Sequence, residues 1–110
     1  MSQIRKQIVT NVKKALIKIG TGVLAGADGL DLNIVEQLVD EMVQLRSKGI
    51  QIVIVTSGAI ASGKHRMGIT GKLKSMPQKQ ACAAIGQGRL MRIYSNAFGK
   101  HSVYVAQILL

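Results

Sequence analysis

The sequence predicts an α/β fold with a parallel sheet, and two observations support this prediction. Three short apolar runs, at residues 15–19, 50–56 and 103–110, have the length and composition of strands. Segments of helical periodicity separate these runs and are long enough to serve as crossover connections. Strands joined in this way lie parallel, so the expected order is helix, strand, helix, strand, helix, helix, strand.

A short amphipathic lead-in helix is expected within residues 2–14, before the first strand. Ile4, Ile8 and Val12 recur there at helical spacing, with basic residues between and beyond them. The same basic residues interrupt any apolar run that a secretory signal would need, so a targeting role is disfavoured.

The first strand, at residues 15–19, is expected to be buried and to enter a glycine loop. Gly20, Thr21 and Gly22 form that loop, because two glycines within three residues break regular structure. Further glycines at positions 26 and 29 indicate that residues 24–30 are also a loop.

A helix and a second strand follow this loop. Asp31 is a preferred N-cap residue, apolar residues repeat behind it at helical spacing, and Gly49 ends the helix. Residues 50–56 are β-branched almost throughout, which is typical of a central strand covered on both faces.

The remaining chain is expected to hold two helices and a basic loop. Residues 59–63 begin a short helix, and residues 64–75, which are basic and contain glycine, form an exposed loop. Residues 77–98 form a long helix with a proline in its first turn. Gly86 and Gly88 lie inside this helix, and we expect them to allow the close approach of a backbone or a ligand.

The length of the chain sets a limit on its core. A chain of 110 residues forms one modest core, and the sequence stops inside the third apolar run without a turn or cap. We therefore expect the natural domain to continue past Leu110.

The composition indicates an anion-binding surface without choosing its ligand. Lysine and arginine number 15 against five acidic residues, for a formal net charge of +10. Such a surface attracts nucleic acid, acidic lipid or phosphorylated metabolites. Aromatic residues make up only 3% of the chain, so platforms for base stacking are scarce. A single cysteine, Cys82, excludes an intramolecular disulfide framework and a cysteine-rich zinc site.

The candidate site lies at the carboxyl ends of the first two strands. In open parallel sheets ligands bind beyond these ends. Lys18 lies near the end of the first strand, and Gly20-Thr21-Gly22 comes directly after that strand. Ser57-Gly58 comes directly after the second strand and leads into a helix. Glycines allow backbone N–H groups to reach phosphate oxygens, and a helix N-terminus adds donors. Together they predict an anion site for a nucleotide and an acidic substrate.

Each part of this site also has a simpler interpretation. Lys18 could be a strand-edge lysine that extends to solvent, and Ser57-Gly58 could be a helix cap and turn. The glycine loop is not a dinucleotide-binding fingerprint, because Ala25 stands where the last glycine would be. The sequence also has no phosphate loop of the GxxxxGK[ST] type.

Other chemically active residues are expected to be structural. His65 and His101 have no companion ligands at metal spacing, so we expect surface histidines and no metal site. Cys82 lies among alanines and is expected to be a packed, small apolar residue. The basic segment 64–79 is more typical of a solvated surface than of a binding patch.

Four blocks of the sequence resemble glutamate 5-kinases, a family of the amino acid kinase superfamily. The blocks lie in the order and at about the spacing found in that family, and they cover nearly all of residues 15–110. They are residues 17–24 (IKIGTGVL), 53–63 (VIVTSGAIASG), 79–91 (KQACAAIGQGRLM) and 106–110 (AQILL).

The resemblance implies a fold and an activity. The fold is a three-layer α/β/α sandwich with a mainly parallel sheet, of which residues 15–110 are the N-terminal part and residues 1–14 a lead-in helix. The activity is ATP-dependent phosphorylation of the side-chain carboxylate of L-glutamate to glutamyl 5-phosphate, the first step of proline biosynthesis. It also implies Mg2+ as cofactor, a cytoplasmic location, a homo-oligomer, no membrane and no nucleic-acid partner.

The resemblance assigns roles to individual residues. Lys18 matches the catalytic lysine that contacts the ATP phosphates, and Gly20 and Thr21 match the glycine loop that binds them. Ser57, with Gly58 and Ala59 beside it, matches the part of the family site that binds glutamate. Gly22 stands where the family more often has serine or threonine.

Two other functions remain open alongside the kinase. One is a small basic module that binds anions or nucleic acid without catalysis, and the other is a remnant that only self-associates through an exposed sheet edge. Family members are considerably longer than 110 residues and carry part of the site in their later half. We therefore expect that this chain alone is not a competent kinase.

Overall fold

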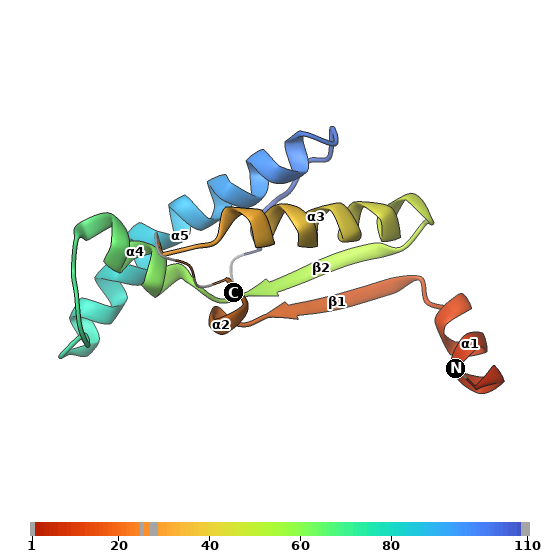
Figure 1. The fold of residues 1–110 in the computed structure, drawn as a ribbon, viewed down its shortest axis with the longest axis horizontal. Helices are drawn as coiled ribbons and strands as arrows, with labels where there is room; N and C mark the ends of the chain where they lie inside the picture. The colour runs from red at the N-terminus through yellow and green to blue at the C-terminus, as the bar shows by residue number, and fades with distance from the viewer. Residues whose placement is uncertain (1, 25, 27–28, 109–110) are drawn as a thin grey trace.

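The computed structural model describes residues 2–24, 26 and 29–108. Figure 1 shows its helices and a two-stranded sheet along the chain. The elements are α1 Gln3–Thr10, β1 Lys14–Ile19, α2 Thr21–Leu24, α3 Leu32–Ser47, β2 Gln51–Thr56, α4 Ala59–Met67 and α5 Met76–Gly99. The predicted α/β class and the first six predicted elements are confirmed, and α2 is an additional helix.

The sheet is parallel, as predicted. Lys14 lies opposite Gln51, and the pairing continues in register to Ile19 opposite Thr56. Helix α3 makes the crossover between the strands, so both strands run in one direction and finish at the same edge.

Helix α3 begins after the predicted cap residue Asp31 and ends before the predicted terminating glycine Gly49. Asp31 accepts hydrogen bonds from the backbone N–H groups of Asn33 and Ile34, at 3.0 and 3.3 Å. These bonds satisfy two donors that have no partner within the helix. At the other end Gly49 has a φ of 88°, a conformation that favours glycine, and the chain turns there into β2.

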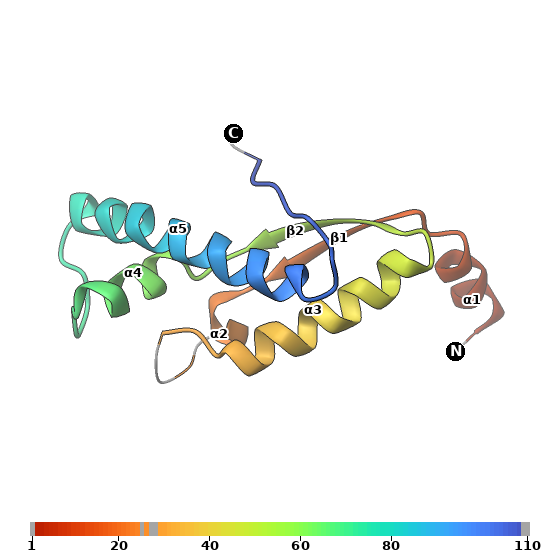
Figure 2. The ribbon, with the colours of Figure 1, turned by 90° about the horizontal axis from the view of Figure 1, so that it is seen from above.

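The core lies on one face of the sheet. Helices α3 and α5 both cover that face (Figures 1 and 2). Ile17 and Ile54 point to it from paired positions of the strands. The buried side chains that α3 and α5 contribute are Val35, Val39, Met42, Leu90, Tyr94, Ala97 and Phe98.

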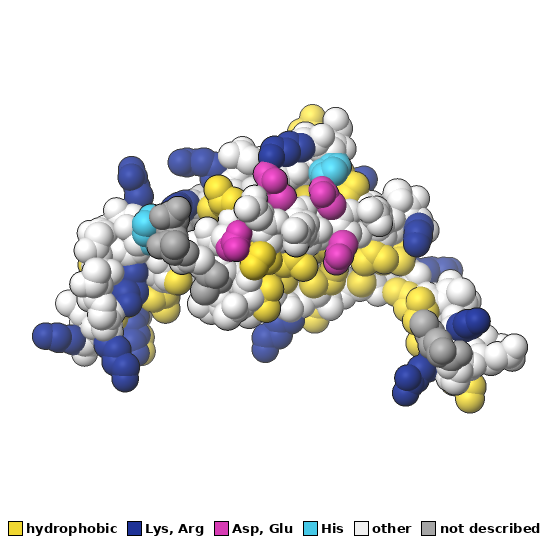
Figure 3. Space-filling view, in the orientation of Figure 1, with side chains coloured by type: hydrophobic (Ala, Val, Ile, Leu, Met, Phe, Trp, Pro, Cys, Tyr) yellow, Lys and Arg dark blue, Asp and Glu magenta, His cyan; other side chains and the backbone are white. Residues whose placement is uncertain are grey.

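The expectation that the second strand is covered on both faces is wrong for the described residues, and the first strand, which was expected to be buried, is exposed on one face. Leu16, Val53 and Val55 are 71%, 48% and 46% exposed. These side chains alternate with the buried ones and point away from α3 and α5. No described element lies along this second side, which we call the open face. Figure 3 shows hydrophobic side chains at the surface along the sheet.

The predicted third strand is also absent from the described part of residues 103–110. Residues 103–108 have no strand structure, and residues 109–110 lie outside the described residues. Val103 and Val105 pack against the core, while Tyr104 between them is 99% exposed, so the side chains alternate as in a strand. A strand also needs a hydrogen-bonded ladder, and residues 104–108 donate no backbone hydrogen bond to a described strand.

Two segments that were expected to be loops are helical. Thr21–Leu24 forms the single turn α2, closed by a hydrogen bond from the Val23 N–H to the Gly20 carbonyl at 3.1 Å. Helix α4 extends through residues 64–67, which the sequence analysis assigned to the basic loop. The glycine that ends α4 is Gly68, whose φ is 70°, and not Gly63.

Gly63 instead lies where α4 and α5 cross in close contact. A Cβ atom on Gly63 would lie 1.9 Å from the carbonyl oxygen of Cys82, and one on Gly86 would lie 1.6 Å from that of Ala59. The predicted approach of a backbone is therefore confirmed at Gly86. It is not found at Gly88, because no described atom outside the neighbouring helix backbone lies within 4 Å of the position that a Cβ on Gly88 would occupy. Cys82 packs at this crossing and is 1% exposed, as predicted.

A hydrogen bond between two side chains fastens the end of β2 to α5. The hydroxyl oxygens of Thr56 and Tyr94 lie 2.9 Å apart. Burial raises the pKa of Tyr94 above its ordinary value of 10.0, and the bond to Thr56 offsets part of that rise. The strand end that carries Ser57 is thereby held against the core.

Replacing Gly86 with alanine is expected to destabilise the protein by about 3 kcal/mol, because the new Cβ forces α5 away from α4. Gly88→Ala is the matched control on the same helix. It adds a Cβ in open space, and its better helix propensity should stabilise the protein by about 1 kcal/mol. Urea unfolding of both variants tests the prediction, and effects of the same sign and size would contradict it.

Tyr94→Phe is expected to cost about 1 kcal/mol at neutral pH, because Thr56 loses its hydroxyl partner. The pKa of Tyr94 is higher in the folded than in the unfolded state, so its contribution is fully present below pH 10.0. That contribution is lost as pH rises through the folded-state pKa.

The free energy of unfolding, measured from about pH 8 to pH 12, should therefore fall more steeply in the wild type than in Tyr94→Phe. Tyr104→Phe, at a 99% exposed ring, is the control and should follow the wild type. A constant difference between wild type and Tyr94→Phe over this range would contradict the prediction.

Candidate anion-binding site at the strand ends

The structure brings the two candidate segments together at one edge of the sheet. Ile19 and Thr56, the last residues of β1 and β2, are paired in register. Directly beyond them, the backbone N–H of Ser57 donates a hydrogen bond to the carbonyl of Ile19 at 2.9 Å. The segment after β1 and the segment after β2 are therefore neighbours.

Lys18 lies on the open face of the sheet, opposite Val55 in the register. Its side chain is exposed, and it forms no ion pair within the described ranges. The amine therefore lies near the strand end without a neutralising carboxylate from the described part of the chain. A free lysine in this place can contact an anion bound beyond the strands.

Gly20 and Thr21 directly follow β1, and Thr21 is the first residue of α2. Gly20 is half-buried and Thr21 is exposed at the first position of α2. No described atom lies within 4 Å of the position that a Cβ on Gly20 or Gly22 would occupy. Crowding within the described chain therefore does not require these glycines, and the backbone here is open to a ligand.

Gly58 directs the chain from β2 into α4. Its φ is 108°, which favours glycine, and a Cβ on it would lie 3.3 Å from Cδ2 of Leu30. It is the N-cap residue of α4, and no side chain caps that terminus. Ser57 before it is exposed and Ala59 after it is half-buried. The first-turn N–H groups of α4 lack a side-chain acceptor, so an anion could accept from them.

The residues at this edge can bind and position anions. Lys18, Gly20, Thr21, Ser57, Gly58 and Ala59 supply a cationic amine, hydroxyl groups and backbone donors, and no carboxylate or imidazole. General acid–base catalysis needs a titratable group near the reacting atoms. This set therefore suits a reaction whose nucleophile is already ionised.

Thr56 and Tyr94 are the residues at this edge that the sequence analysis missed. Their hydroxyl–hydroxyl contact fixes the strand end from which Ser57 and Gly58 follow. The two residues are 38 positions apart. Two features of the sequence could have indicated the contact. One is the threonine at the end of the second strand, and the other is the tyrosine among the apolar residues of the long helix.

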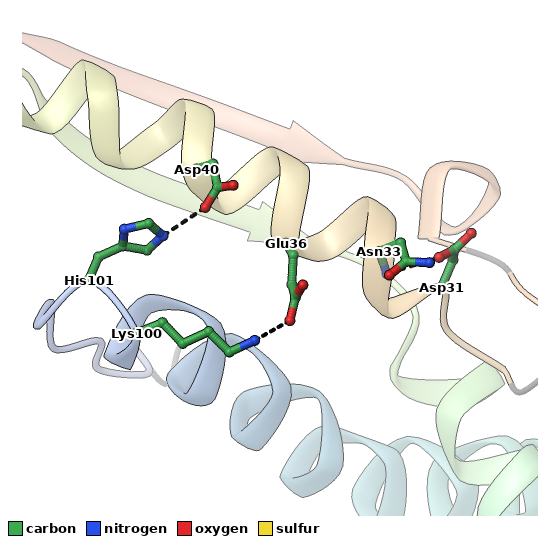
Figure 4. Close-up of polar contacts among 6 residues, drawn as sticks. All are labelled: Asp31, Asn33, Glu36, Asp40, Lys100 and His101. Atoms are coloured by element: carbon green, nitrogen blue, oxygen red, sulfur yellow. Dashed lines mark hydrogen bonds and ion pairs between the residues drawn. The ribbon is translucent and has the colours of Figure 1, made fainter.

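The two histidines lie on different elements, and neither belongs to this edge. His65 is exposed on α4. The Nε2 atom of His101 lies 2.7 Å from the Oδ1 atom of Asp40, and Lys100 pairs with Glu36 beside it (Figure 4). These two ion pairs fasten the C-terminal end of α5 to α3. Residues 2–24, 26 and 29–108 contain no cluster of three His, Cys, Asp or Glu side chains placed to hold a metal ion.

None of the helices within the described residues has both the length and the apolar character needed to cross a bilayer.

Comparison with known proteins finds relatives that share one name, glutamate 5-kinase. The chain is 66% identical over 110 residues to a glutamate 5-kinase of Syntrophus aciditrophicus, covering 100% of this chain and 29% of that protein. It is 50% identical over 107 residues to a glutamate 5-kinase of Geobacter metallireducens, covering 96% and 29%. A glutamate 5-kinase of Syntrophotalea carbinolica is 47% identical over 106 residues, with coverage of 96% and 28%. The chain thus spans less than a third of these relatives' length.

These relatives confirm the resemblance to glutamate 5-kinases that the four sequence blocks indicate. The model of the amino acid kinase family matches residues 13–110, which include both strands and every residue of the candidate site. This chain belongs to the amino acid kinase family.

Proposed function

We propose that the protein carrying this chain is a glutamate 5-kinase, which transfers the γ-phosphoryl group of ATP to the side-chain carboxylate of L-glutamate. The observation that carries the proposal is the hydrogen bond from the Ser57 N–H to the Ile19 carbonyl, because it makes the segment after β1 and the segment after β2 neighbours. A phosphoryl transfer between two anions needs two such segments at one edge. The relatives named glutamate 5-kinase support the choice of substrate.

In this proposal the segment after β1 binds the phosphates of ATP. Lys18 contacts the phosphoryl group that is transferred and offsets the charge that develops on it. The backbone at Gly20 and Thr21 approaches the phosphates, which is consistent with the open space around Gly20. ATP supplies the phosphoryl group, and these residues hold it in place.

The segment after β2 binds glutamate. Ser57 donates a hydrogen bond from its exposed hydroxyl, and Gly58 and Ala59 present the uncapped N-terminus of α4. Backbone donors and the helix dipole both favour a carboxylate there. Since α4 starts directly after β2, glutamate lies next to the phosphate segment.

The reaction needs positioning more than proton transfer. An oxygen of the glutamate side-chain carboxylate forms a bond to the γ-phosphorus, and the bond from that phosphorus to the bridging oxygen of ADP breaks. The carboxylate has an ordinary pKa of about 4.3 and is already ionised at neutral pH, so no general base is required. Holding the two anions in line supplies most of the catalysis.

Magnesium has no set of ligands among these six residues. Hard divalent cations prefer carboxylate and phosphate oxygens, and the six residues include no aspartate or glutamate. The metal would be held by the phosphates and by groups elsewhere in a protein of the relatives' length. We include in the proposal the role in proline biosynthesis, the cytoplasmic location and the homo-oligomer, all of which follow from the family resemblance.

Lys18→Ala, made in the whole natural protein, is expected to lower kcat about 100-fold with little change in the KM for glutamate, because a charge contact to the transferred group is lost. Lys14→Ala is the matched control, since Lys14 is exposed on the same face of β1 at the end remote from the site. A coupled assay of ADP release measures both variants, and equal losses in both would contradict the role of Lys18.

Ser57→Ala is expected to raise the KM for glutamate about 10-fold and to leave kcat within a few-fold of the wild type, because one hydrogen bond to the substrate is lost. Ser95→Ala, at an exposed position of α5, should change neither constant. The site assignment is wrong if Ser57→Ala mainly lowers kcat while Lys18→Ala mainly raises the KM for glutamate.

The 110-residue chain alone is expected to show no kinase activity, because it spans 29% of the length of a 66% identical relative. ATP- and glutamate-dependent hydroxamate formation by the pure chain measures this, with the whole protein as positive control. Activity in the chain would show that residues 1–110 hold a complete site. Tight, salt-dependent oligonucleotide binding by an inactive whole protein would favour the basic binding module instead.

A further inference from the structure

A second concentration of positive charge lines a cleft between α4 and α5, away from the strand ends. His65 and Arg66 come from the last turn of α4, and Arg89 and Arg92 come from α5. Arg89 and Arg92 are three positions apart, so they lie on one face of their helix. The other described lining residues are Ile85 and Gly88, so no described carboxylate faces the cleft.

Arg89 differs from the other basic residues of this cleft because one of its nitrogen atoms is buried without a partner among the described residues. Its Nη1 atom is buried and has no hydrogen-bond partner among the described residues. A buried donor on a charged group costs free energy when it is left unpaired. The planar guanidinium group can bind two oxygens of one oxyanion at the same time, and Arg89 lines the cleft, so the part of the group that faces the cleft can bind an oxyanion in this way.

Asp31, an acidic residue that lines an adjoining hollow, does not serve as an acceptor for the buried nitrogen of Arg89. An adjoining hollow shares His65 and Arg89 with the cleft and is also lined by Asp31. The Oδ1 atom of Asp31 accepts from the first-turn N–H groups of α3, and Asp31 forms no ion pair with Arg89. The positive charge of the cleft is therefore not neutralised by the described chain.

The walls of the cleft are held rigidly. The crossing at Gly63 and Gly86 fixes α4 against α5, so the basic side chains of the two helices face one another at a set spacing. Gly88 also lines the cleft and does not crowd it, since no described atom outside the neighbouring helix backbone lies within 4 Å of where a Cβ on Gly88 would be. Basic residues in the last turn of α4 also suit its helix dipole, but this does not account for Arg89 on the facing helix.

We propose that this cleft binds a free oxyanion of the size and charge of inorganic phosphate, held by Arg89 with Arg92, Arg66 and His65 around it. The cleft shares no residue with the strand-end site, so its occupant is additional to ATP and glutamate. A bound dianion would balance the charge of these four basic side chains and so stabilise the packing of α4 on α5.

The test is thermal unfolding of the whole natural protein in inorganic phosphate and in chloride at equal ionic strength. Phosphate should raise the Tm of the wild type by several degrees and should raise the Tm of Arg89→Met not at all. In chloride, Arg89→Met should melt no lower than the wild type, because the variant removes an unpartnered buried donor. Arg92→Gln, at an exposed position, should need about 10-fold more phosphate for the same effect.

Two controls separate this site from the general charge and from the strand ends. Arg46→Met removes an equal charge from the last turn of α3 and should keep the full response to phosphate. Lys18→Ala should also keep it. The proposal is overturned if the wild type shows no phosphate-specific rise, or if Arg89→Met and Arg92→Gln respond like the wild type. It is also overturned if only Lys18→Ala loses the response, which would place the phosphate at the strand ends.

Discussion

Helices α4 and α5 meet backbone to backbone at Gly63 and Gly86, and the positions of both candidate sites depend on this contact. No side chain larger than hydrogen fits at either position, since a Cβ would lie 1.9 or 1.6 Å from a carbonyl oxygen. The contact sets the direction of α4, whose N-terminus follows β2 at the candidate site. It also sets the direction of α5, which carries Leu90 and Tyr94 onto the covered face of the sheet.

The distribution of charge follows from where the carboxylates lie. Every acidic residue within the described ranges lies on α3 or caps it, and Figure 3 shows them gathered on one part of the surface. Glu36 and Asp40 are used to hold the end of α5. The basic residues of β1, α4 and the middle of α5 are left without described acidic partners. Their field is positive around both the strand ends and the α4–α5 cleft, which favours the approach of phosphates.

The sequence analysis was accurate where a local signal determines the structure. The cap at Asp31, the turn at Gly49 and the proline at the start of α5 each act on neighbouring residues, and each was placed correctly. The convergence of the two strand ends also followed, because parallel strands must finish at one edge. The similarity to glutamate 5-kinases supplied the residue roles, which local patterns alone left open.

Features that depend on distant parts of the chain could not be predicted. The close contact at Gly63 depends on α5, a helix from a later part of the chain, and the Thr56–Tyr94 contact joins residues 38 positions apart. The apolar residues of the open face predicted burial on two sides, but burial depends on what covers them. A sequence pattern reports that a surface is apolar and does not identify its cover.

The parallel pairing of β1 and β2 has a consequence for synthesis on the ribosome. Lys14 pairs with Gln51, which is 37 positions later (51 − 14). At about 5–20 residues per second, β1 therefore leaves the peptidyl-transferase centre about 2–7 s before its partner is made. During that interval the backbone of β1 is unpaired, and its two isoleucines have no core to enter. The hydrogen-bonded ladder of β1 therefore cannot form until α3 and β2 have also been made and have left the ribosome.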